Sequence, residues 1–306
     1  MKKKVLILGA NGMLGSMMTD YLSQKDDIEL TITSRNGDAF LELENIRRFP
    51  FAVDSEFDKT DYYDYVINCI GLIKPRIDES KINSVLNAIE VNSVFPLILP
   101  DFTNAKIIQI ATDCVFSGKS ELPYEEVNPH DATDVYGKTK SLGENKHERV
   151  YLLRCSIIGP EHNKKQSLME WLLSQPDGSE VNGYTNHRWN GLTTLAFAKI
   201  CYGIIRDDLE TPKWTDKSRG PHIIPTGCMS KYELLSTIIQ VFKKDIKVKP
   251  TTATERINRR LTTMWKYNNE FWAHAGYPEP LSIREMVEEL YDYLQKDSII
   301  WKGRFN

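Results

Sequence analysis

The start of the chain places an apolar strand directly before a glycine-rich turn, and this pattern limits the fold more than any other. Residues 5–8 are all apolar, and Gly9, Gly12 and Gly15 follow at intervals of three residues. An amphipathic stretch over 16–23 comes next, so the pattern predicts strand, turn and helix. Glycines at such a turn let backbone N–H groups approach a pyrophosphate, which then lies at the N-terminus of the helix. We therefore expect the first unit of a dinucleotide-binding fold.

Short apolar runs recur through the first half of the chain, with polar or helical stretches between them. The runs predict buried strands, and the stretch 82–95 predicts a helix. Strands that alternate with helices predict an α/β fold with a Rossmann-like, doubly wound parallel sheet. The predicted strands after the first are 28–33, 51–54, 65–71 and 106–111.

The second half of the chain is less regular, yet no linker rich in proline or glycine separates it from the first. We expect 1–159 to form an NADP(H)-binding Rossmann domain that also receives segments around 188–225. Residues 160–187 and 226–306 are expected to form a smaller α/β lobe that binds the substrate.

The ends of the predicted strands are where the adenosine half of a cofactor would bind. Arg35 follows the second strand, where an arginine accommodates the 2′-phosphate of NADP(H) and an acidic residue would hold NAD(H). A solvated arginine looks the same in sequence, so NAD(H) stays the alternative. Asp54 ends the third strand and is either an adenine contact or an ordinary turn residue. Gly71 ends the fourth, at the edge where ligands of α/β sheets bind.

A second motif lies at and after the predicted strand 106–111. Thr112 follows this strand directly, and Tyr136 and Lys140 lie four residues apart, which places them on one face of a helix. Tyrosine has an ordinary pKa of about 10, and an ammonium one turn away lowers that pKa. Such a tyrosine can protonate a carbonyl oxygen while a nicotinamide supplies hydride. The same spacing occurs on many amphipathic helices, so the glycine turn is what gives the motif its meaning.

Composition and charge exclude several classes of partner. The formal net charge is −3, so neither nucleic acid nor an anionic membrane is expected to bind. The five cysteines lack metal-binding or redox-motif spacing, which favours buried thiols in a reducing cytoplasm and no metal site. No signal peptide is expected, and no stretch approaches the roughly 18 apolar residues that span a bilayer.

Together these motifs resemble the extended short-chain dehydrogenase/reductase superfamily. Within it, the sequence is most similar to the dTDP-4-dehydrorhamnose reductase family of sugar-nucleotide ketoreductases. The resemblance is firm over about the first half of the chain. The matching positions are Gly9, Gly12, Gly15, 68–71, Asn92, 112–118, 136–140, 143–144, 152–154 and Gly159.

The resemblance implies a role for each matching residue. Tyr136 would protonate the C4 oxygen of a 4-keto-6-deoxyhexose, Lys140 would lower the tyrosine pKa and hold the nicotinamide ribose, and Thr112 would hydrogen-bond the same oxygen. The expected cofactor contacts are Gly9, Asn11, Gly12, Met13, Leu14, Gly15, Arg35, Asp54, Asn68, Cys69, Ile70, Gly71, Asn92, Ala111, Tyr136 and Lys140. The expected substrate contacts are Asp113, Val115, Phe116, Asn186, Arg188 and Trp189.

The sequence also departs from the family pattern beside the proposed catalytic threonine. Members commonly have Ser-Thr-Asp-Tyr where this chain has Ala111, Thr112, Asp113 and Cys114, which removes a hydroxyl and an aromatic ring. The loop 74–80 differs as well. These departures leave the reaction type in place and the identity of the sugar open.

Two stretches of the second half are candidates for contacts with a sugar nucleotide. The stretch 181–194 contains Asn186, Arg188 and Trp189; a guanidinium matches phosphate geometry and an indole can stack on a base or sugar. A capped helix entry with a packed tryptophan is the alternative. Three arginines lie within 255–260, and a solvated helix face is slightly favoured there over a diphosphate clamp.

Two other functions remain open at this point. An epimerase or dehydratase of the same superfamily would use the same tyrosine and lysine with tightly bound NAD, and Asp113 occupies the position of an added dehydratase acid. A non-catalytic regulatory subunit, of the type found with methionine adenosyltransferase, is the other. A homodimer is left open too.

Overall fold

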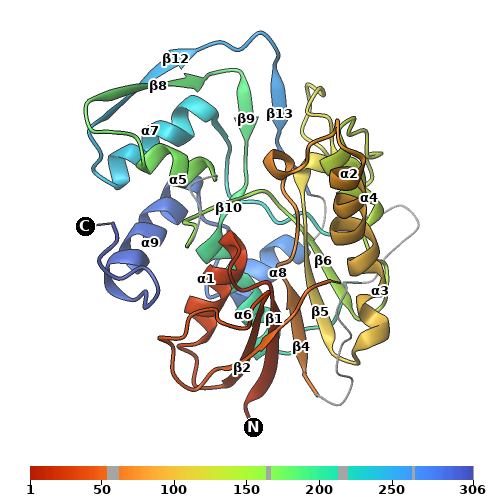
Figure 1. Cartoon of the computed structure of the whole chain (residues 1–306). Helices are drawn as coiled ribbons and strands as arrows, with labels where there is room; N and C mark the ends of the chain where they lie inside the picture. The colour runs from red at the N-terminus through yellow and green to blue at the C-terminus, as the bar shows by residue number, and fades with distance from the viewer. Residues whose placement is uncertain (54–61, 163–166, 213–219, 264–265, 306) are drawn as a thin grey trace.

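The first lobe is built on a six-stranded parallel sheet. The structure is a computed structural model that describes residues 1–53, 62–162, 167–212, 220–263 and 266–305. The strand order is β3-β2-β1-β4-β5-β6, which confirms the predicted Rossmann-like doubly wound fold (Figure 1). The strands are β1 (Lys3–Leu8), β2 (Ile28–Ser34), β3 (Arg47–Pro50), β4 (Tyr65–Asn68), β5 (Lys106–Ala111) and β6 (Val150–Arg154). The order reverses between β1 and β4, so ligands are expected at the carboxyl ends of these two strands.

Helices cover both faces of this sheet, and alternate residues of a strand point to opposite faces. Val5 and Ile7 of β1 belong to one apolar core, whereas Leu6 and Leu8 belong to another. Figure 1 shows α1 and α6 on one side of the sheet and α2, α3 and α4 on the other. These helices are α1 (Met13–Leu22), α6 (Thr194–Arg206), α2 (Ile82–Ile89), α3 (Phe95–Phe102) and α4 (Val135–Leu142).

The third strand lies earlier in the chain than predicted. We expected it over 51–54, but β3 pairs from Arg47 with Thr31 to Pro50 with Ser34. The two arginines hid this strand, because an edge strand needs an apolar side chain only on its inner face. Phe51 still donates its N–H to the carbonyl of Ser34, and Asp54 lies outside the described residues.

The helix expected over 82–95 continues to Phe102. A π-helical turn, Glu90–Val94, joins α2 to α3, so neither Pro96 nor Pro100 ends the segment. The segment Ile82–Phe102 has 21 residues and is apolar enough to cross a membrane by length and composition, contrary to our expectation that no such stretch exists. Phe95 and Leu99 are buried in the core on one face of the sheet, and 33% of the most apolar window of the segment is buried.

The expected second lobe contains two small sheets and, within its described residues, four helices. In one sheet β8 (Ser179–Tyr184) pairs in parallel with β12, and in the other β9 (His187–Trp189) lies between β11 and β13. Figure 1 places both sheets and α7 above the carboxyl edge of the large sheet. The remaining elements are β7 (Ile157–Ile158), β10 (Leu192–Thr193), β11 (Met229–Ser230), β12 (Ile246–Thr251), β13 (Ile257–Arg259), α5 (Leu168–Leu173), α7 (Lys231–Val241), α8 (Tyr267–His274) and α9 (Ile283–Lys296).

The helix favoured for 255–260 is therefore wrong, because this stretch forms strand β13. Its inner residue Asn258 is fully buried and donates its amide to the carbonyls of Ser120, Glu121 and Leu122. The strand is consequently anchored to the loop that follows β5, the loop that begins with the candidate residue Thr112.

We propose that the folded chain divides into the two lobes that were expected from the sequence. Helix α6 packs on α1, and Pro221 accepts a hydrogen bond from the N–H of Arg154 at the end of β6. Both contacts support assigning parts of 188–225 to the first lobe.

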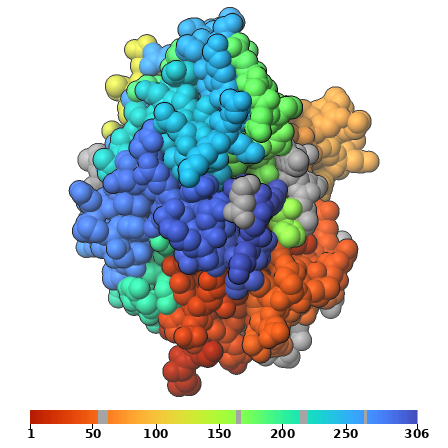
Figure 2. Space-filling model, turned by 90° about the vertical axis from the view of Figure 1, so that its left-hand side faces the viewer, coloured from red at the N-terminus to blue at the C-terminus, as the bar shows by residue number. Residues whose placement is uncertain are grey.

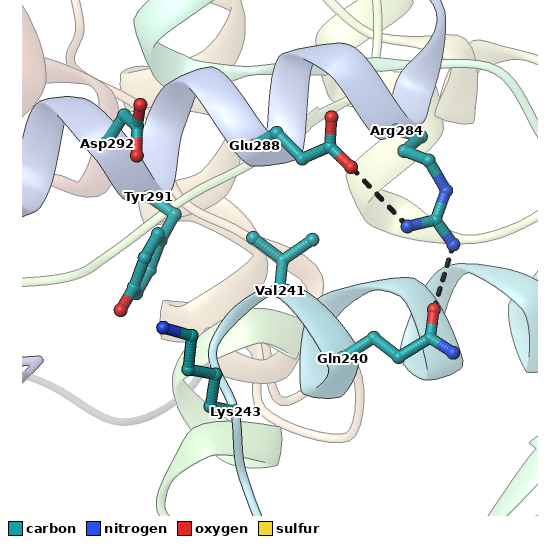
Figure 3. A pocket seen from close by; sticks show the side chains of 7 residues that line it. All are labelled: Gln240, Val241, Lys243, Arg284, Glu288, Tyr291 and Asp292. Carbon is teal, nitrogen blue, oxygen red and sulfur yellow. Dashed lines mark hydrogen bonds and ion pairs between the residues drawn. The ribbon is translucent and has the colours of Figure 1, made fainter.

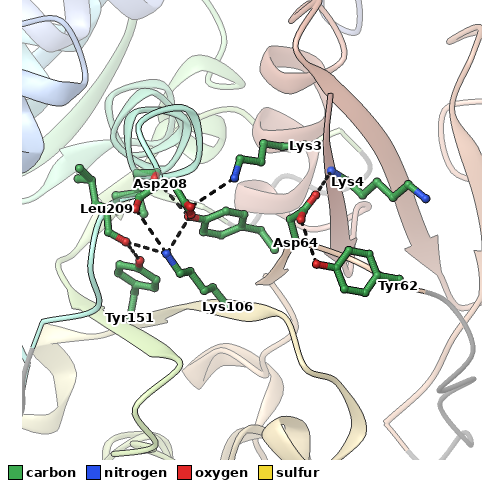
Figure 4. Close-up of polar contacts among 10 residues, drawn as sticks. Lys3, Lys4, Tyr62, Asp64, Lys106, Tyr151, Asp208 and Leu209 are labelled. Carbon is green, nitrogen blue, oxygen red and sulfur yellow. Dashed lines mark hydrogen bonds and ion pairs between the residues drawn. The ribbon is translucent and has the colours of Figure 1, made fainter. Parts of the chain in front are cut away.

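The amino edge of the large sheet is tied together by Asp208, which follows α6. Its carboxylate accepts a hydrogen bond from Tyr65 at 2.6 Å and pairs with Lys106 at 2.9 Å and Lys3 at 3.4 Å (Figure 4). These contacts lower the pKa of Asp208 to about 2, with the Tyr65 hydrogen bond as the largest cause. This network lies at the opposite edge from the expected ligand site.

The C-terminal helix and tail fasten the two lobes together. Figure 2 shows this segment, in dark blue, between the red and orange first lobe and the cyan and green second lobe. The buried carboxylate of Asp20 on α1 accepts the N–H groups of Ile299 and Ile300 at 2.9 Å and the hydroxyl of Tyr293 at 2.9 Å. The rear of α1 is therefore held rigidly, while its N-terminus faces the carboxyl edge of the sheet.

Candidate active site

The glycine turn provides an open helix N-terminus. Gly9 has a φ of +81°, which favours glycine, and a Cβ on Gly15 would lie 2.2 Å from the carbonyl oxygen of Gly9. Helix α1 begins after Gly12 without a side-chain cap, and Asn11 and Gly12 are exposed. The free N–H groups of the first turn match the requirement of a pyrophosphate, so the residues present fit a dinucleotide.

The end of β4 lies against this turn. A Cβ on Gly9 would lie 2.8 Å from Cγ1 of Ile70, so the two strand ends are in contact. The amide of Asn68 donates to Gln109 at 2.7 Å, and its oxygen accepts the N–H of Ile70 at 3.0 Å. Asn68 therefore shapes the backbone leading to Gly71, which is exposed. Of the other expected contacts, Leu14 and Ala111 are buried, and Met13 and Cys69 are half-buried.

Asn92 lies inside the protein, and its side chain joins two parts of the site. Its oxygen accepts the N–H of Leu72, while its amide donates to the Leu72 carbonyl and to the hydroxyl of Thr139 on α4. The π-helical turn that contains Asn92 thus connects the end of β4 to the helix of the catalytic motif. Its predicted contact with the cofactor stays a prediction, with these three bonds already made.

Arg35 follows β2 at the carboxyl edge, as expected. Its side chain is exposed, and within the described part of the chain it has no hydrogen bond or ion pair. A free guanidinium at this place suits a 2′-phosphate.

The candidate catalytic motif, Thr112, Tyr136 and Lys140, lies at the end of β5 and in the first turns of α4. Asp134 caps α4 by accepting the N–H of Gly137 at 2.8 Å, which fixes the start of the helix beside Tyr136. The hydroxyl of Thr112 donates to Asp113 at 3.2 Å and accepts the N–H of Cys114 at 3.1 Å. Tyr136 and Lys140 are both half-buried on α4.

The pKa values of Tyr136 and Lys140 differ from the expectation that the lysine lowers the pKa of the tyrosine. Burial raises the pKa of Tyr136 above its ordinary value, and a hydrogen bond with Thr112 opposes this rise. Burial also lowers the pKa of Lys140 to about 8, with Arg154 lowering and Glu144 raising it. In this structure the pKa of Tyr136 is therefore raised, contrary to the expected lowering.

The three expected substrate contacts after Thr112 are buried. Val115 and Phe116 fill a small core in which the Phe116 ring stacks on Tyr124 at 4.3 Å, so contact with a substrate would fall to their backbone. Burial raises the pKa of Asp113, and the charge of Arg259 opposes the rise. Asp113 is thus an internal partner of Thr112 in this structure.

Arg259 is a residue of the site that sequence reasoning missed. Its guanidinium reaches from β13 to the Phe116 carbonyl at 2.5 Å and the Asp113 carbonyl at 3.4 Å. It is paired in register with Trp189 of β9, so the two side chains share one face of the small sheet. The sequence signal was the arginine cluster of 255–260, read there as a solvated helix.

The other two candidates of the second lobe have partners within it. Asn186 exchanges two hydrogen bonds with the backbone of Ala253, at 2.7 and 3.0 Å. Arg188, on the opposite face of β9 from Trp189, lies 3.7 Å from Glu233 on α7. Their predicted contacts with a sugar nucleotide stay predictions. Arg259 is bonded to the segment after Thr112, and Trp189, its neighbour in register, packs against the main core.

A cavity of about 440 Å³ lies elsewhere on the surface, between the end of α7 and α9 (Figure 3). Arg284 crosses it to reach Gln240 at 2.9 Å and Glu288 at 3.5 Å. None of its lining residues belongs to the catalytic motif, so this cavity is not the site of the expected chemistry.

Comparison with known proteins identifies the family. The sequence matches the RmlD substrate binding domain family over residues 2–292. This chain belongs to that family. The match extends through both lobes, so it includes the less regular second half of the chain.

Among characterised relatives, the spore coat polysaccharide biosynthesis protein SpsK of Bacillus subtilis is 27% identical, over 96% of this chain and 98% of its own length. A dTDP-4-dehydrorhamnose reductase of Mycolicibacterium smegmatis is 29% identical over 70% of this chain and 58% of its own length. A solved dTDP-4-dehydrorhamnose reductase of Bacillus anthracis, in complex with NADP, has the same fold. Its TM-score is 0.66 at 18% identity, over 95% of this chain and 99% of that one.

Proposed function

We propose that this protein is an NADPH-dependent reductase of the C4 keto group of a nucleotide-linked 4-keto-6-deoxy sugar, acting in deoxysugar and surface polysaccharide biosynthesis. The observation behind the proposal is the placement of Thr112, Tyr136 and Lys140 at the carboxyl edge, beside a glycine turn that fits a dinucleotide. Membership of the RmlD substrate binding domain family and similarity to sugar-nucleotide reductases support the same conclusion.

The residues of the chain divide the reaction between them. Thr112 and Tyr136 hydrogen-bond the keto oxygen, and the phenol gives its proton to that oxygen as negative charge develops. A bound reduced nicotinamide supplies the hydride. Lys140, charged below about pH 8, stabilises the phenolate that forms and holds the nicotinamide ribose. Because the pKa of Tyr136 is raised in the free protein, this stabilisation matters only once the substrate accepts the proton.

The preference for NADPH rests on Arg35 and on a relative. Arg35 is exposed at the end of β2, and the related Bacillus anthracis reductase binds NADP. NAD(H) remains the second cofactor to be tested.

On the substrate side, we propose that Trp189 and Arg259 contact the sugar nucleotide from the second lobe. Both lie on the same face of the small sheet, and from this face Arg259 reaches the carbonyl of Phe116. An arginine beside the keto-sugar site can bind hydroxyl or phosphate oxygens, and an indole can stack on the sugar or base.

The test is oxidation of NADPH with a panel of dTDP-, UDP- and GDP-linked 4-keto-6-deoxyhexoses, followed by chromatography of the sugar nucleotides. Consumption of one equivalent of NADPH per product, with one nucleotide preferred, is the expected result. No consumption and no new product with any member would defeat the proposal and favour a regulatory subunit.

One observation supports a second candidate, an epimerase or dehydratase that retains NAD. Asp113 lies beside Thr112, at the position where a dehydratase acid is expected, and its raised pKa suits a proton donor. Appearance of a new sugar nucleotide without NADPH consumption, together with NAD that copurifies in stoichiometric amount, would favour this candidate.

A further inference from the structure

A buried ion pair lies behind the catalytic motif. Arg154, the last residue of β6, is 0% exposed, and its guanidinium binds both oxygens of Glu144 at 2.6 and 2.9 Å. Such bidentate pairing fixes the relative position of two side chains as well as their charges. Glu144 is the second residue after α4, the helix of Tyr136 and Lys140.

The same guanidinium reaches a third segment. One of its N–H groups donates to the carbonyl of Thr112 at 3.0 Å, and its central carbon, Cζ, lies 5.7 Å from the centre of the Phe116 ring. The strand that ends in Thr112 and the helix that contains Tyr136 are thereby attached to one rigid group. An error of about 1 Å in the distance between them would lower the rate strongly.

The pair also forms the electrostatic environment of Lys140. Glu144 comes four residues after Lys140, the spacing at which side chains neighbour each other on a helix, and its N–H donates to the carbonyl of Ser141. Its carboxylate raises the pKa of Lys140, and the guanidinium of Arg154 lowers it. Tyr136 precedes Lys140 by one turn on α4, Asp113 lies in the segment packed against that helix, and His130 lies 3.8 Å from Glu144.

We propose that Glu144 and Arg154 are positioning residues: their ion pair holds Thr112 in register with Tyr136, and the Glu144 carboxylate stabilises the neighbouring Lys140 ammonium. The mechanistic part of this inference rests on the proposed reductase function. The effect on the charge of Lys140 does not, because it can be measured without turnover.

Three variants separate charge from geometry. Glu144→Gln keeps the shape and removes the carboxylate, so the Lys140 pKa falls by about one unit. Arg154→Lys keeps the charge and loses the fork, so the Lys140 pKa stays and kcat falls about tenfold with little change in KM. Glu170→Gln is the matched control. Glu170 is also buried and paired with an arginine, Arg304 at 2.9 Å, and neither residue belongs to the proposed site.

The first readout is competitive acetylation of Lys140 with acetic anhydride between about pH 6 and about pH 11, quantified by mass spectrometry of its peptide. The second is the pH profile of kcat/KM, whose alkaline limb should move to lower pH in Glu144→Gln alone. Thermal unfolding of each variant checks that it is folded. If Glu144→Gln does not fold, Glu144→Asp replaces it, with an unchanged Lys140 pKa and a reduced kcat as the expected result.

An unchanged Lys140 pKa in Glu144→Gln would overturn the electrostatic part of the proposal, as would an equal shift in Glu170→Gln. Wild-type kcat in Arg154→Lys or Glu144→Asp would overturn the geometric part. If no keto sugar is turned over, the acetylation data still decide the effect of Glu144 on Lys140, so failure of the reductase proposal is distinguishable.

Discussion

The segment 112–116, which contains the proposed catalytic threonine, and the face of the second lobe that contacts it are held in place in different ways. Asp113, Val115 and Phe116 are all buried, and the Thr112 carbonyl is bound by the buried guanidinium of Arg154. On the other side, half-buried Arg259 reaches the segment with one guanidinium nitrogen.

This difference assigns separate tasks to the two regions. A closely packed segment keeps reacting groups within the small tolerance that proton transfer needs, whereas partly exposed side chains can adapt to a substrate. Substitutions in the first region should therefore change kcat, and substitutions in the second should change KM.

Tyr136→Phe should have the largest effect. It removes the proton donor and leaves the packing of the ring, so kcat should fall by about 10²–10⁴-fold. Steady-state kinetics give this value, and NADPH titration by fluorescence serves as the control, since cofactor affinity should be nearly unchanged. A variant that retains more than about a tenth of the wild-type rate would remove Tyr136 from its role.

Lys140→Met should lower kcat and stabilise the fold. Burial lowers the pKa of Lys140 from 10.5 to about 8, so the charged ammonium destabilises the folded state below about pH 8. This cost disappears as pH rises toward 10.5, where the lysine is neutral in the unfolded chain too. The gain should be about 1–2 kcal/mol at neutral pH, discounted for the partial exposure of the side chain.

Chemical denaturation of wild type and Lys140→Met at pH values on both sides of 8 measures this gain. A gain that grows as pH rises would have the wrong sign and would show that the ammonium stabilises the folded state.

Arg259→Met should raise the KM for the sugar nucleotide about tenfold or more and change kcat less, because the arginine lies on the adaptable side of the site. Arg256→Met is the matched control: Arg256 directly precedes β13, and among the described residues its one ion pair is a surface pair with Glu121 at 3.3 Å. Equal KM values for the two variants would show that Arg259 does not contribute to binding of the sugar nucleotide.

Arg35→Ser should have the smallest effect on activity. It tests whether an exposed residue of the first lobe also changes KM and not kcat. Arg35 is exposed, so it should behave like the second region despite its place beside the large sheet. The KM for NADPH should rise about tenfold while kcat and the KM for NADH stay nearly constant. An equal rise for both cofactors would show that the arginine does not read the 2′-phosphate.

The first lobe could be predicted well because its information is local. Gly9, Gly12 and Gly15 follow a strand within a few residues, and Tyr136 and Lys140 share a helical turn, so period and spacing suffice. The position of β3 was predicted wrongly, because this edge strand shows no alternation of apolar and polar residues.

The second lobe's share of the site could not be read in the same way. Arg259 reaches Phe116 across 143 residues of chain, and no local pattern encodes a contact of that separation. Arg154 looked like an ordinary strand end, and its role depends on a glutamate placed by the end of another element. The raised pKa of Tyr136 was missed because its largest cause is burial, which the spacing of Tyr136 and Lys140 does not show.

The most direct measurement follows deuterium from the cofactor. The enzyme would be incubated with NADPH deuterated at C4 of the nicotinamide, in both stereochemical forms, and the keto sugar nucleotide that the panel identifies. The account predicts that one of the two forms transfers one deuterium to C4 of the sugar, with one equivalent of NADP produced. A new sugar nucleotide without deuterium, formed while the added NADPH stays intact, would contradict net reduction and establish internally recycled hydride instead.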